Sequence, residues 1–430
     1  MTERVPLSRF TAVLRNRNFG FLFAGQTVAA FGNSMYTLAM LWTMQTETRH
    51  QSNSALLMAV LLMAALLPNI LLAPIAGVLV DRWPKRLTML VTDYVRFALL
   101  GLLTLLSTHH WTLPWVLIAF NLLLSAAGTV FRPATVVLQK EIVSNDLLLE
   151  ANSVQNIGQK TTEILGPAVG GVLIGLFGTT TVFSINAGTF LVSALSLTIL
   201  RAAEPPRIRG SLKPQALYGD IQAGMRVYLS IPYAKALTPF LLMYNFPIAA
   251  IEFLIVKFVA NALHDASNHG AFIVGVFNTC LAAGELTGGF FVSRVSRLWP
   301  RERLPIICMS ITALCVVAIG FLRQPVVIAA LFFVSGFFMI ITNTAYFTGI
   351  QQDTPSAALG RMYALLIALF QGVIPLSQLV FGAAAAVLPV GSLLSTAGGL
   401  AFLGACSAWM HPDIRRPPAQ TPSALEESMS

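Results

Sequence analysis

The side chains of this sequence that could do chemistry are charged residues that stand inside long apolar stretches. They are, in chain order, Asp93, Arg96, Lys160, Glu163, Glu252 and Glu285. An ionised group is costly at the depth of a bilayer, so residues of this kind are usually functional. A carboxyl group in apolar surroundings also takes up a proton more readily than one in water. The set therefore predicts proton uptake and release within a membrane.

Four of these charges form two pairs by their spacing. Asp93 and Arg96 are three residues apart, and so are Lys160 and Glu163. Residues at this spacing share one face of a helix. Each pair can therefore be structural, with the two charges neutralising each other inside the protein.

The other two carboxylates, Glu252 and Glu285, have no oppositely charged residue one helical turn away. An unpaired carboxylate is the better proton carrier, because no neighbouring cation holds it ionised. We therefore favour Glu252 and Glu285 over Asp93 as coupling residues. Glu163 is intermediate, since Lys160 keeps it ionised unless protonation breaks the pair.

The elements that must position these residues are membrane helices. Of the 430 residues, 56% are hydrophobic and 10% are charged, whereas soluble proteins have about 25% charged residues. About 20 apolar residues cross the hydrocarbon of a bilayer. We predict an all-α polytopic membrane protein with twelve transmembrane helices. Their predicted limits are 19–43, 55–80, 87–107, 113–135, 152–177, 180–200, 235–259, 270–293, 304–322, 325–349, 362–387 and 391–410.

The basic residues predict which side of the membrane each loop faces. All but five of the 27 Lys and Arg residues fall at the N-terminus, in alternate loops or in the C-terminal tail. The opposite side has only Arg49, Lys257 and Arg323, while Arg96 and Lys160 lie inside spans. Because cytoplasmic loops carry the excess of basic residues, both termini are predicted to be cytoplasmic. The net charge of +9 is thus a topology signal, and we do not expect nucleic-acid binding.

Weak internal repeats predict two halves related by an axis normal to the membrane. Several positions recur at an offset of 212 residues, among them Asn33 with Asn245 and Gly170 with Gly382. A Pro- and Arg-rich stretch separates the halves. The predicted parts are a cytoplasmic N-terminus at 1–18, a six-helix bundle at 19–200, a cytoplasmic linker at 201–234, a second six-helix bundle at 235–410 and a disordered tail at 411–430.

The loop between the second and third predicted spans resembles the signature of the major facilitator superfamily, although Pro84 stands where the signature usually has glycine. Its residues are Gly77, Asp81, Arg82, Lys85 and Arg86. The resemblance implies the major facilitator fold, with two pseudo-symmetric six-helix bundles in a bacterial inner membrane. Proteins of this family usually work as monomers, so a monomer is expected.

In the family, the acid of this loop helps to hold the two bundles together on the cytoplasmic side. The resemblance gives that gating role to Asp81, and Gly360 and Arg361 at the start of the eleventh span are the expected opposite surface. A helix N-terminus attracts a carboxylate, which agrees with this contact. The alternative is that the charges of the loop only enforce topology.

A second stretch, "GPAVGG", resembles the signature of exporters within the superfamily. Its characteristic residues are Gly166, Pro167, Gly170 and Gly171, although Thr162 replaces a glycine that usually precedes them. Proline removes a backbone donor and can bend the helix, and glycines permit close helix contact. The stretch "RNRNFGFLFAGQTVAAFGNSMYTLAMLW" is also similar to macrolide-efflux and enterobactin-exporter proteins. Ordinary small-residue packing is the alternative reading.

The family binds its cargo between the two bundles, mostly on the first, fourth, seventh and tenth spans. In this sequence those spans offer a polar, uncharged set, namely Gln26, Asn33, Tyr36, Asn121, Ser125, Tyr244, Asn245, Asn343 and Tyr346. Such a set suits a small amphipathic organic molecule. Taken singly, each of these residues could instead make an interhelical hydrogen bond.

The sequence thus predicts a proton-driven exporter of an amphipathic compound, such as a drug, a macrolide-like molecule or a siderophore. A lysophospholipid flippase or an uptake carrier of the same fold remains open, and so does a membrane receptor or scaffold that transports nothing. We expect no enzyme activity and no cofactor, because the sequence has no GxxxxGK[ST], HExxH or nucleophile-elbow motif. The four cysteines lie in apolar runs without a CxxC spacing, so no metal site is expected.

Overall fold

The computed structural model describes residues 7–72, 76, 79, 83–200, 225–263, 267–355 and 358–411. Its regular elements in these ranges are helical, which confirms the predicted all-α class. The helices are α1 (Leu7–Arg15), α2 (Arg17–Glu47), α3 (Ser54–Leu71), α5 (Lys85–Thr108), α6 (Pro114–Gly128), α7 (Phe131–Ile142), the short 3-10 helix η1 (Asn145–Leu147), α8 (Leu148–Phe177), α9 (Thr179–Ile199), α11 (Pro232–Ile248), α12 (Ile251–Ala262), α13 (Asn268–Val295), α14 (Leu304–Phe321), α15 (Pro325–Asp353), α16 (Leu359–Ala384) and α17 (Val390–Ala408).

Ten helical stretches in the described ranges are long and apolar enough to cross a membrane. Two further helices, α2 and α8, are also long, with 31 and 30 residues, but they are not among the ten. The multi-pass character is therefore established, whereas the count of twelve stays a prediction.

Two of the predicted spans are each built from two helices. The span predicted at 113–135 is broken at Thr129 and Val130, between α6 and α7. The span predicted at 235–259 is broken at Ala249 and Ala250, directly after Pro247. Proline has no amide hydrogen to continue the helical ladder, so helices bend or end close to it. The residues at both breaks keep helical backbone angles, so each pair of helices still forms one continuous candidate span.

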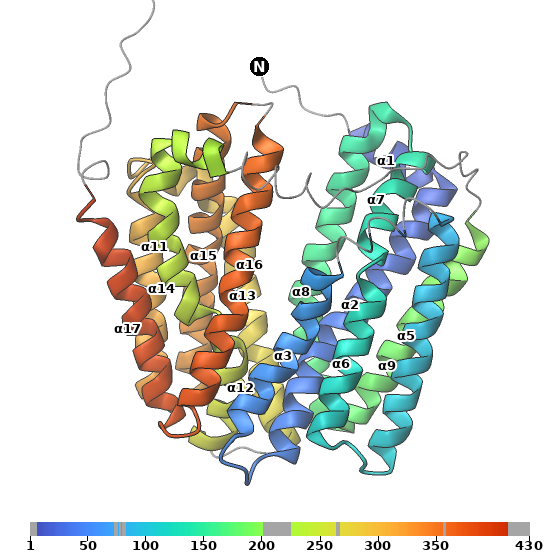
Figure 1. Ribbon diagram of the computed structural model, residues 1–430, viewed down its shortest axis with the longest axis horizontal. Coiled ribbons are helices and arrows are strands. Elements are labelled where there is room, and N and C mark those ends of the chain that lie inside the picture. The colour runs from blue at the N-terminus through green and yellow to red at the C-terminus, as the bar shows by residue number, and fades with distance from the viewer. Residues whose placement is uncertain are drawn as a thin grey trace, which may run out of the picture.

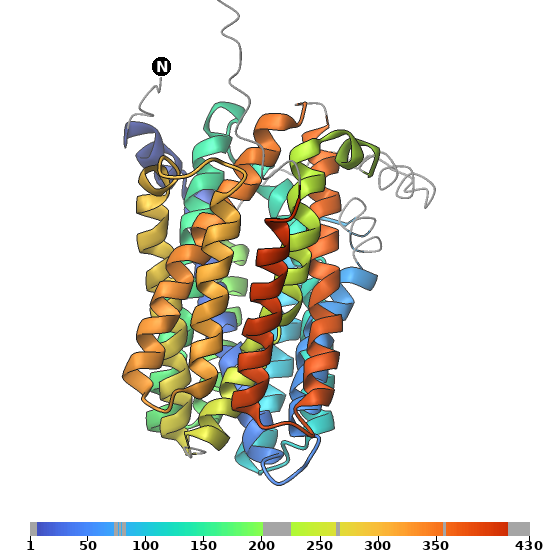
Figure 2. The same cartoon turned by 90° about the vertical axis from the view of Figure 1, so that its left-hand side faces the viewer.

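The helices form two groups that lie side by side (Figure 1). Helices α1 to α9 make the N-terminal bundle, and helices α11 to α17 make the C-terminal bundle. The start of α1 and the end of α17 lie at the same end of the molecule, which we call the terminal end (Figures 1 and 2). The loops from α2 to α3 and from α16 to α17 lie at the opposite end, the distal end. Most of the predicted linker, residues 201–224, is outside the described residues, and residues 225–230 are helical.

Among the described residues, the apolar cluster that joins the two bundles lies toward the distal end. One continuous core cluster there contains residues of both bundles, including Met44 and Leu57 from the N-terminal one and Phe258, Phe381 and Val390 from the C-terminal one. At the terminal end the described apolar clusters stay within one bundle each. Since burial of apolar surface is the main favourable term in such packing, this arrangement is closed at the distal end.

Small residues let helices of the two bundles approach each other at two places. A Cβ atom added to Gly171 on α8 would lie 2.9 Å from the Cα atom of Gly275 on α13. One added to Gly382 on α16 would lie 2.8 Å from the Cβ atom of Ala59 on α3. Contacts this short leave no room for a side chain, so glycine is required for the helices to pack as they do.

Candidate functional site

The N-terminal bundle contains a polar cavity of about 480 Å³ between α2, α7 and α8. Gln26 lies at its centre: its Nε2 atom donates a hydrogen bond to Thr135 Oγ1 at 2.9 Å, and its Oε1 atom accepts one from Gln155 Nε2 at 2.7 Å. Asn33 lines the same cavity, and its side chain makes no hydrogen bond with the described residues. The remaining polar lining residues are Thr27, Ser34, Arg96, Arg132, Gln139, Asn152, Asn156, Gln159, Thr162 and Glu163.

A second cavity of about 180 Å³ adjoins the first, because Asn33 and Arg96 line both. In its wall, Tyr36 donates a hydrogen bond from its hydroxyl to Asn121 Oδ1 at 3.4 Å, and Asn121 Nδ2 donates to the carbonyl oxygen of Leu61 at 2.7 Å. The two cavities thus form one polar surface with amide, hydroxyl and aromatic groups. Five of the nine residues predicted to contact cargo line it, namely Gln26, Asn33, Tyr36, Asn121 and Ser125.

Asp93 and Arg96 do not form an ion pair within the described residues, although their spacing allows one. Asp93 is fully buried and accepts a hydrogen bond from Ser193 Oγ at 2.6 Å. The guanidinium carbon of Arg96 lies 5.5 Å from the ring centre of Phe131 and 5.1 Å from that of Phe190. The two rings stabilise the cation by cation–π interactions, so the charge that faces the cavity is that of Arg96.

The predicted cargo residues of the C-terminal bundle lie in different surroundings. Tyr244 and Tyr346 are buried in its apolar core, where Tyr346 exchanges a hydrogen bond with Thr238 at 2.8 Å between their hydroxyl oxygens. Asn245 Nδ2 donates to the carbonyl of Leu241 in its own helix at 3.0 Å, and Asn343 is exposed. We therefore place the candidate cargo surface in the N-terminal bundle.

Glu252 lies beside the break between α11 and α12, at a separate cavity of about 380 Å³. Most of the lining is apolar, with Ile255, Leu281 and Phe332 among the larger side chains. Among the described lining residues Glu252 is the only acidic one, and none of them is basic. The structure thus gives this carboxylate no cationic neighbour in the cavity wall, as its sequence position suggests.

Glu285, in contrast, lies within electrostatic range of charged residues that its sequence neighbourhood does not reveal. Lys160 Nζ and Glu163 Oε2 form an ion pair at 2.5 Å on α8, and Glu163 Oε1 accepts a hydrogen bond from Gln159 Nε2 at 3.0 Å. Glu285, on α13 of the other bundle, interacts electrostatically with both Lys160 and Glu163. We call these three residues the interface cluster. It brings one positive and two negative charges together where the bundles meet.

The glycines of the "GPAVGG" stretch face three different neighbours on α2 and α13. Gly166 lies against Ser34, Gly170 lies against Met35, and Gly171 lies against Gly275. Pro167 is inside α8, and its carbonyl oxygen is 2.9 Å from where a Cβ atom on Gly275 would be. The stretch therefore packs the helix that carries the interface cluster against both bundles.

The predicted gating loop is described only in part. Gly77, Asp81 and Arg82 lie outside the described residues, and Lys85 begins α5. Arg86 donates hydrogen bonds to the carbonyl oxygens of Leu197 and Thr198, at 2.7 and 2.5 Å. These carbonyls belong to the last turn of α9, where a cation is favourable. Arg86 thus caps a helix of its own bundle, a role that the sequence motif alone does not indicate.

The opposite surface predicted for this loop, Gly360 and Arg361, lies in the first turn of α16. Nearby at the terminal end, Arg301 Nη1 and Nη2 donate to the two carboxylate oxygens of Asp353, at 2.9 and 3.0 Å. Burial lowers the pKa of Arg301, but hydrogen bonds to Asp353 and Glu302 outweigh it and raise the pKa above its ordinary value. The pair ties the loop before α14 to the end of α15.

The known proteins that this chain resembles are transporters. A family described as "Transmembrane secretion effector" matches residues 8–423. The chain is 34% identical to the uncharacterised MFS-type transporter YfiS of Bacillus subtilis over 42% of its own length and 41% of that protein. It is 21% identical to macrolide efflux protein A of Streptococcus pyogenes over 81% and 84% of the two lengths. It is 28% identical to multidrug efflux pump Tap of Mycolicibacterium fortuitum over 50% of its own length and 53% of that protein. The match thus spans less than half of YfiS and about half of Tap.

Solved structures of transporters share the fold. A bacterial homologue of the human lysosomal transporter Spinster, in an inward-facing and unoccupied conformation, superposes with a TM-score of 0.68. The match covers 94% of this chain and 99% of that one, at 13% identity. Nucleoside transporter NupG gives a TM-score of 0.65 over 90% and 98% of the two chains, at 14% identity. At such identities the likeness concerns the fold alone.

Proposed function

Because this chain belongs to the transmembrane secretion effector family of major facilitator transporters, we propose that it exports an amphipathic organic compound from the cytoplasm by proton antiport. The terminal end is then the cytoplasmic end, in a bacterial inner membrane. The division into two six-helix bundles, at 19–200 and 235–410, is part of the same proposal. The cargo is a drug, a macrolide-like molecule or a siderophore, which enters the polar cavities of the N-terminal bundle.

The interface cluster is the observation that carries this proposal. Lys160 and Glu163 belong to one bundle and Glu285 to the other, and together they have a net charge of minus one when all three are ionised. One proton makes the cluster neutral. Because like and opposite charges at this interface repel or attract one another, a change in the net charge of the cluster alters the free energy of holding α8 against α13. A proton can thereby bias the equilibrium between the two arrangements of the bundles.

The polar cavities support the proposed class of cargo. Asn33, Tyr36 and Asn121 offer donors and acceptors without a net charge, and the rings of Phe131 and Phe190 hold the cation of Arg96 at the cavity wall. Pockets for organic ligands combine aromatic walls with a few polar groups in this way. The names of two relatives, a macrolide efflux protein and a multidrug efflux pump, favour export as the direction.

The direct test measures accumulation of labelled macrolides, dyes and siderophores in cells with and without the protein, before and after addition of an uncoupler. Expression is expected to lower accumulation of at least one compound, and the uncoupler is expected to abolish the difference. Accumulation that rises with expression would indicate uptake, and movement of lysophospholipid alone would indicate a flippase. Either result contradicts the proposal.

Replacing Asn33 with alanine is expected to raise the KM for the exported compound by about threefold to tenfold, the value of one lost hydrogen bond. Asn33 lines both cavities, and its side chain has no hydrogen bond to lose within the described residues. The thermal stability should therefore be unchanged. Asn53→Ala, in the loop before α3, is the matched control. A KM that is the same for both variants would place the cargo elsewhere.

A further inference from the structure

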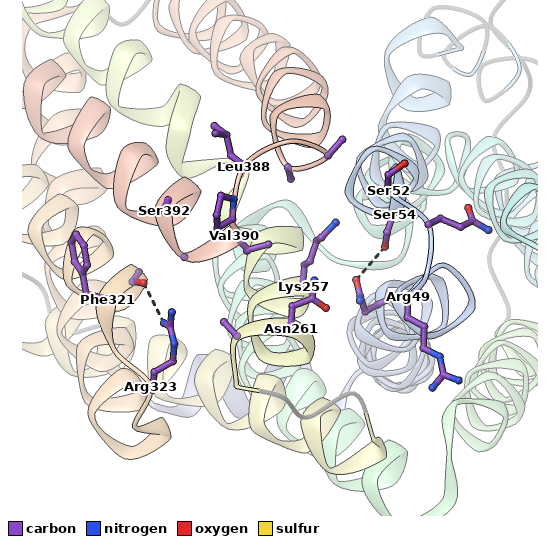
Figure 3. Close-up of a pocket in the computed structure, with 18 residues that line it drawn as sticks. Arg49, Ser52, Ser54, Lys257, Asn261, Phe321, Arg323, Leu388, Val390 and Ser392 are labelled. Atoms are coloured by element: carbon purple, nitrogen blue, oxygen red, sulfur yellow. Dashed lines mark hydrogen bonds between the residues drawn. The ribbon is translucent and has the colours of Figure 1, made fainter.

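The largest cavity described for this protein is not among those proposed for cargo. It has a volume of about 620 Å³ and lies at the distal end, between the two bundles (Figure 3). Gln45, Arg49 and Ser54 line it from the N-terminal bundle, and Lys257 and Arg323 line it from the C-terminal one. Its three basic residues, Arg49, Lys257 and Arg323, are the ones that the sequence analysis assigns to the side of the membrane opposite the termini. We call this cavity the distal pocket.

Lys257 is a buried residue whose ammonium group has no partner among the described residues. Its residue surface is only 6% exposed, and it makes no hydrogen bond or ion pair with any residue that the structure describes. Figure 3 shows its side chain in the middle of the pocket, beside Asn261. A buried ammonium group is costly unless it is paired and hydrogen-bonded. The position of Lys257 therefore points to a negatively charged group inside the pocket.

The rest of the lining also favours an anion. Arg49 lies on the α2 side of the pocket and Arg323 on the α14 side, and no acidic side chain is among the described lining residues. Arg323 Nη1 donates to the carbonyl oxygens of Leu322 and Gly320, at 2.9 and 3.4 Å. Its Nη2 atom is 3.5 Å from where a Cβ atom on Gly391 would lie. Arg323 is thus a second cation at the rim of the pocket, and N–H groups of its guanidinium other than those on Nη1 can donate to a ligand.

A helix N-terminus adds further donors to the same pocket. Helix α17 begins at Val390, and Val390, Gly391 and Ser392 all line the pocket. The amide groups of a first helical turn have no acceptor within the helix, and they carry the positive end of the helix dipole. Anions bind at such positions. The amides, Lys257 and Arg323 are therefore independent sources of positive potential that converge on one cavity.

We propose that the distal pocket binds a phosphate-type oxyanion, either free in solution or as the headgroup of an anionic lipid. The shared chemistry is a compact group with several acceptor oxygens, which matches an ammonium group, a guanidinium group and backbone amides together. A ligand that contacts residues of both bundles stabilises the arrangement in which the distal end is closed. This inference does not depend on the identity of the exported compound or on proton coupling.

The test uses the purified full-length protein in nanodiscs of phosphatidylcholine. Sodium phosphate is titrated against sodium chloride at equal ionic strength, and the Tm is followed by tryptophan fluorescence. A parallel arm replaces part of the lipid with phosphatidylglycerol and adds no phosphate. Lys257→Gln is compared with Lys235→Gln, a matched control at an exposed position in the first turn of α11. Arg323→Gln changes an exposed residue of the same pocket, so it tests the site even if the Lys257 variant does not fold.

We expect a saturable rise of the Tm in at least one arm, with the apparent affinity reduced about tenfold or more by Lys257→Gln and unchanged by Lys235→Gln. A rise with phosphate identifies a free oxyanion as the ligand, and a rise only with phosphatidylglycerol identifies a lipid headgroup. Both results support the site. A Tm that moves equally in the pocket and control variants, or that moves in neither arm, overturns it.

Discussion

Replacing Gly171 with leucine is expected to lower export by about tenfold or more while leaving each bundle folded. A Cβ atom at this position would lie 2.9 Å from the Cα atom of Gly275 and 3.0 Å from the carbonyl oxygen of Ala271, both on α13. Backbone atoms cannot yield without moving the whole helix. Overpacking of this kind costs about 1–3 kcal/mol, and the cost falls only on arrangements in which α8 and α13 are in contact here.

The measurement is export of the compound identified by the accumulation assay, together with the Tm and the yield of purified protein. Gly101→Leu on α5 is the matched control, because a Cβ atom there meets nothing within 4 Å. Gly275→Leu is expected to reproduce the effect from the other side of the contact. If Gly171→Leu exports as well as Gly101→Leu, the contact between α8 and α13 does not take part in the transport cycle.

Replacing Glu285 with glutamine is expected to abolish uphill export while leaving the exchange of cargo down its own gradient. Glutamine holds the interface cluster at the net charge that protonation gives it, so the proton gradient no longer changes its free energy. We expect proton-driven export to fall by about tenfold or more, which corresponds to about 1.4 kcal/mol of lost coupling free energy. The readout is transport into proteoliposomes with and without an imposed pH gradient, which separates coupling from binding.

Glu302→Gln is the control for this substitution, because Glu302 forms a surface ion pair with Arg301 away from the interface. Glu252→Gln is measured beside it, since Glu252 lines a separate cavity. If Glu252→Gln removes the dependence on the pH gradient and Glu285→Gln does not, the coupling residue is Glu252, and the interface cluster is structural. If neither variant changes the gradient dependence, proton antiport through these carboxylates is wrong.

The sequence predicts the helices of this protein well and their interruptions poorly. Long apolar runs define ten spans directly, because the energetic demand of the bilayer acts on length and composition alone. The break at Ala249 and Ala250 has a local signal in Pro247, but proline is also tolerated inside membrane helices, as Pro167 is in α8. Which prolines interrupt a helix depends on its neighbours, and the sequence does not contain that information locally.

The candidate site shows the same division between local and long-range information. The pairing of Lys160 with Glu163 follows from a spacing of three residues and is present. The approach of Glu285 to that pair joins residues of different bundles, so helical periodicity does not predict it. Arg96 illustrates the reverse case, because it makes no ion pair with Asp93 and instead lies against the rings of Phe131 and Phe190 from distant segments. The convergence of Lys257, Arg323 and the start of α17 on one pocket is likewise a property of the fold.

The polarity of α2 and α8 has a consequence for how the protein is made. Helix α2 is translated before α7 and α8, yet it is outside the ten candidate spans, and its Gln26 finds its partners in Thr135 and Gln155. Those partners are translated more than a hundred residues later. Until then the amide of Gln26 has no protein partner in the hydrocarbon, where each unsatisfied group is costly. The hydrogen bonds of Gln26 are therefore complete only once α8 is present, and a chain truncated before α8 should be degraded faster than the full chain by membrane quality-control proteases.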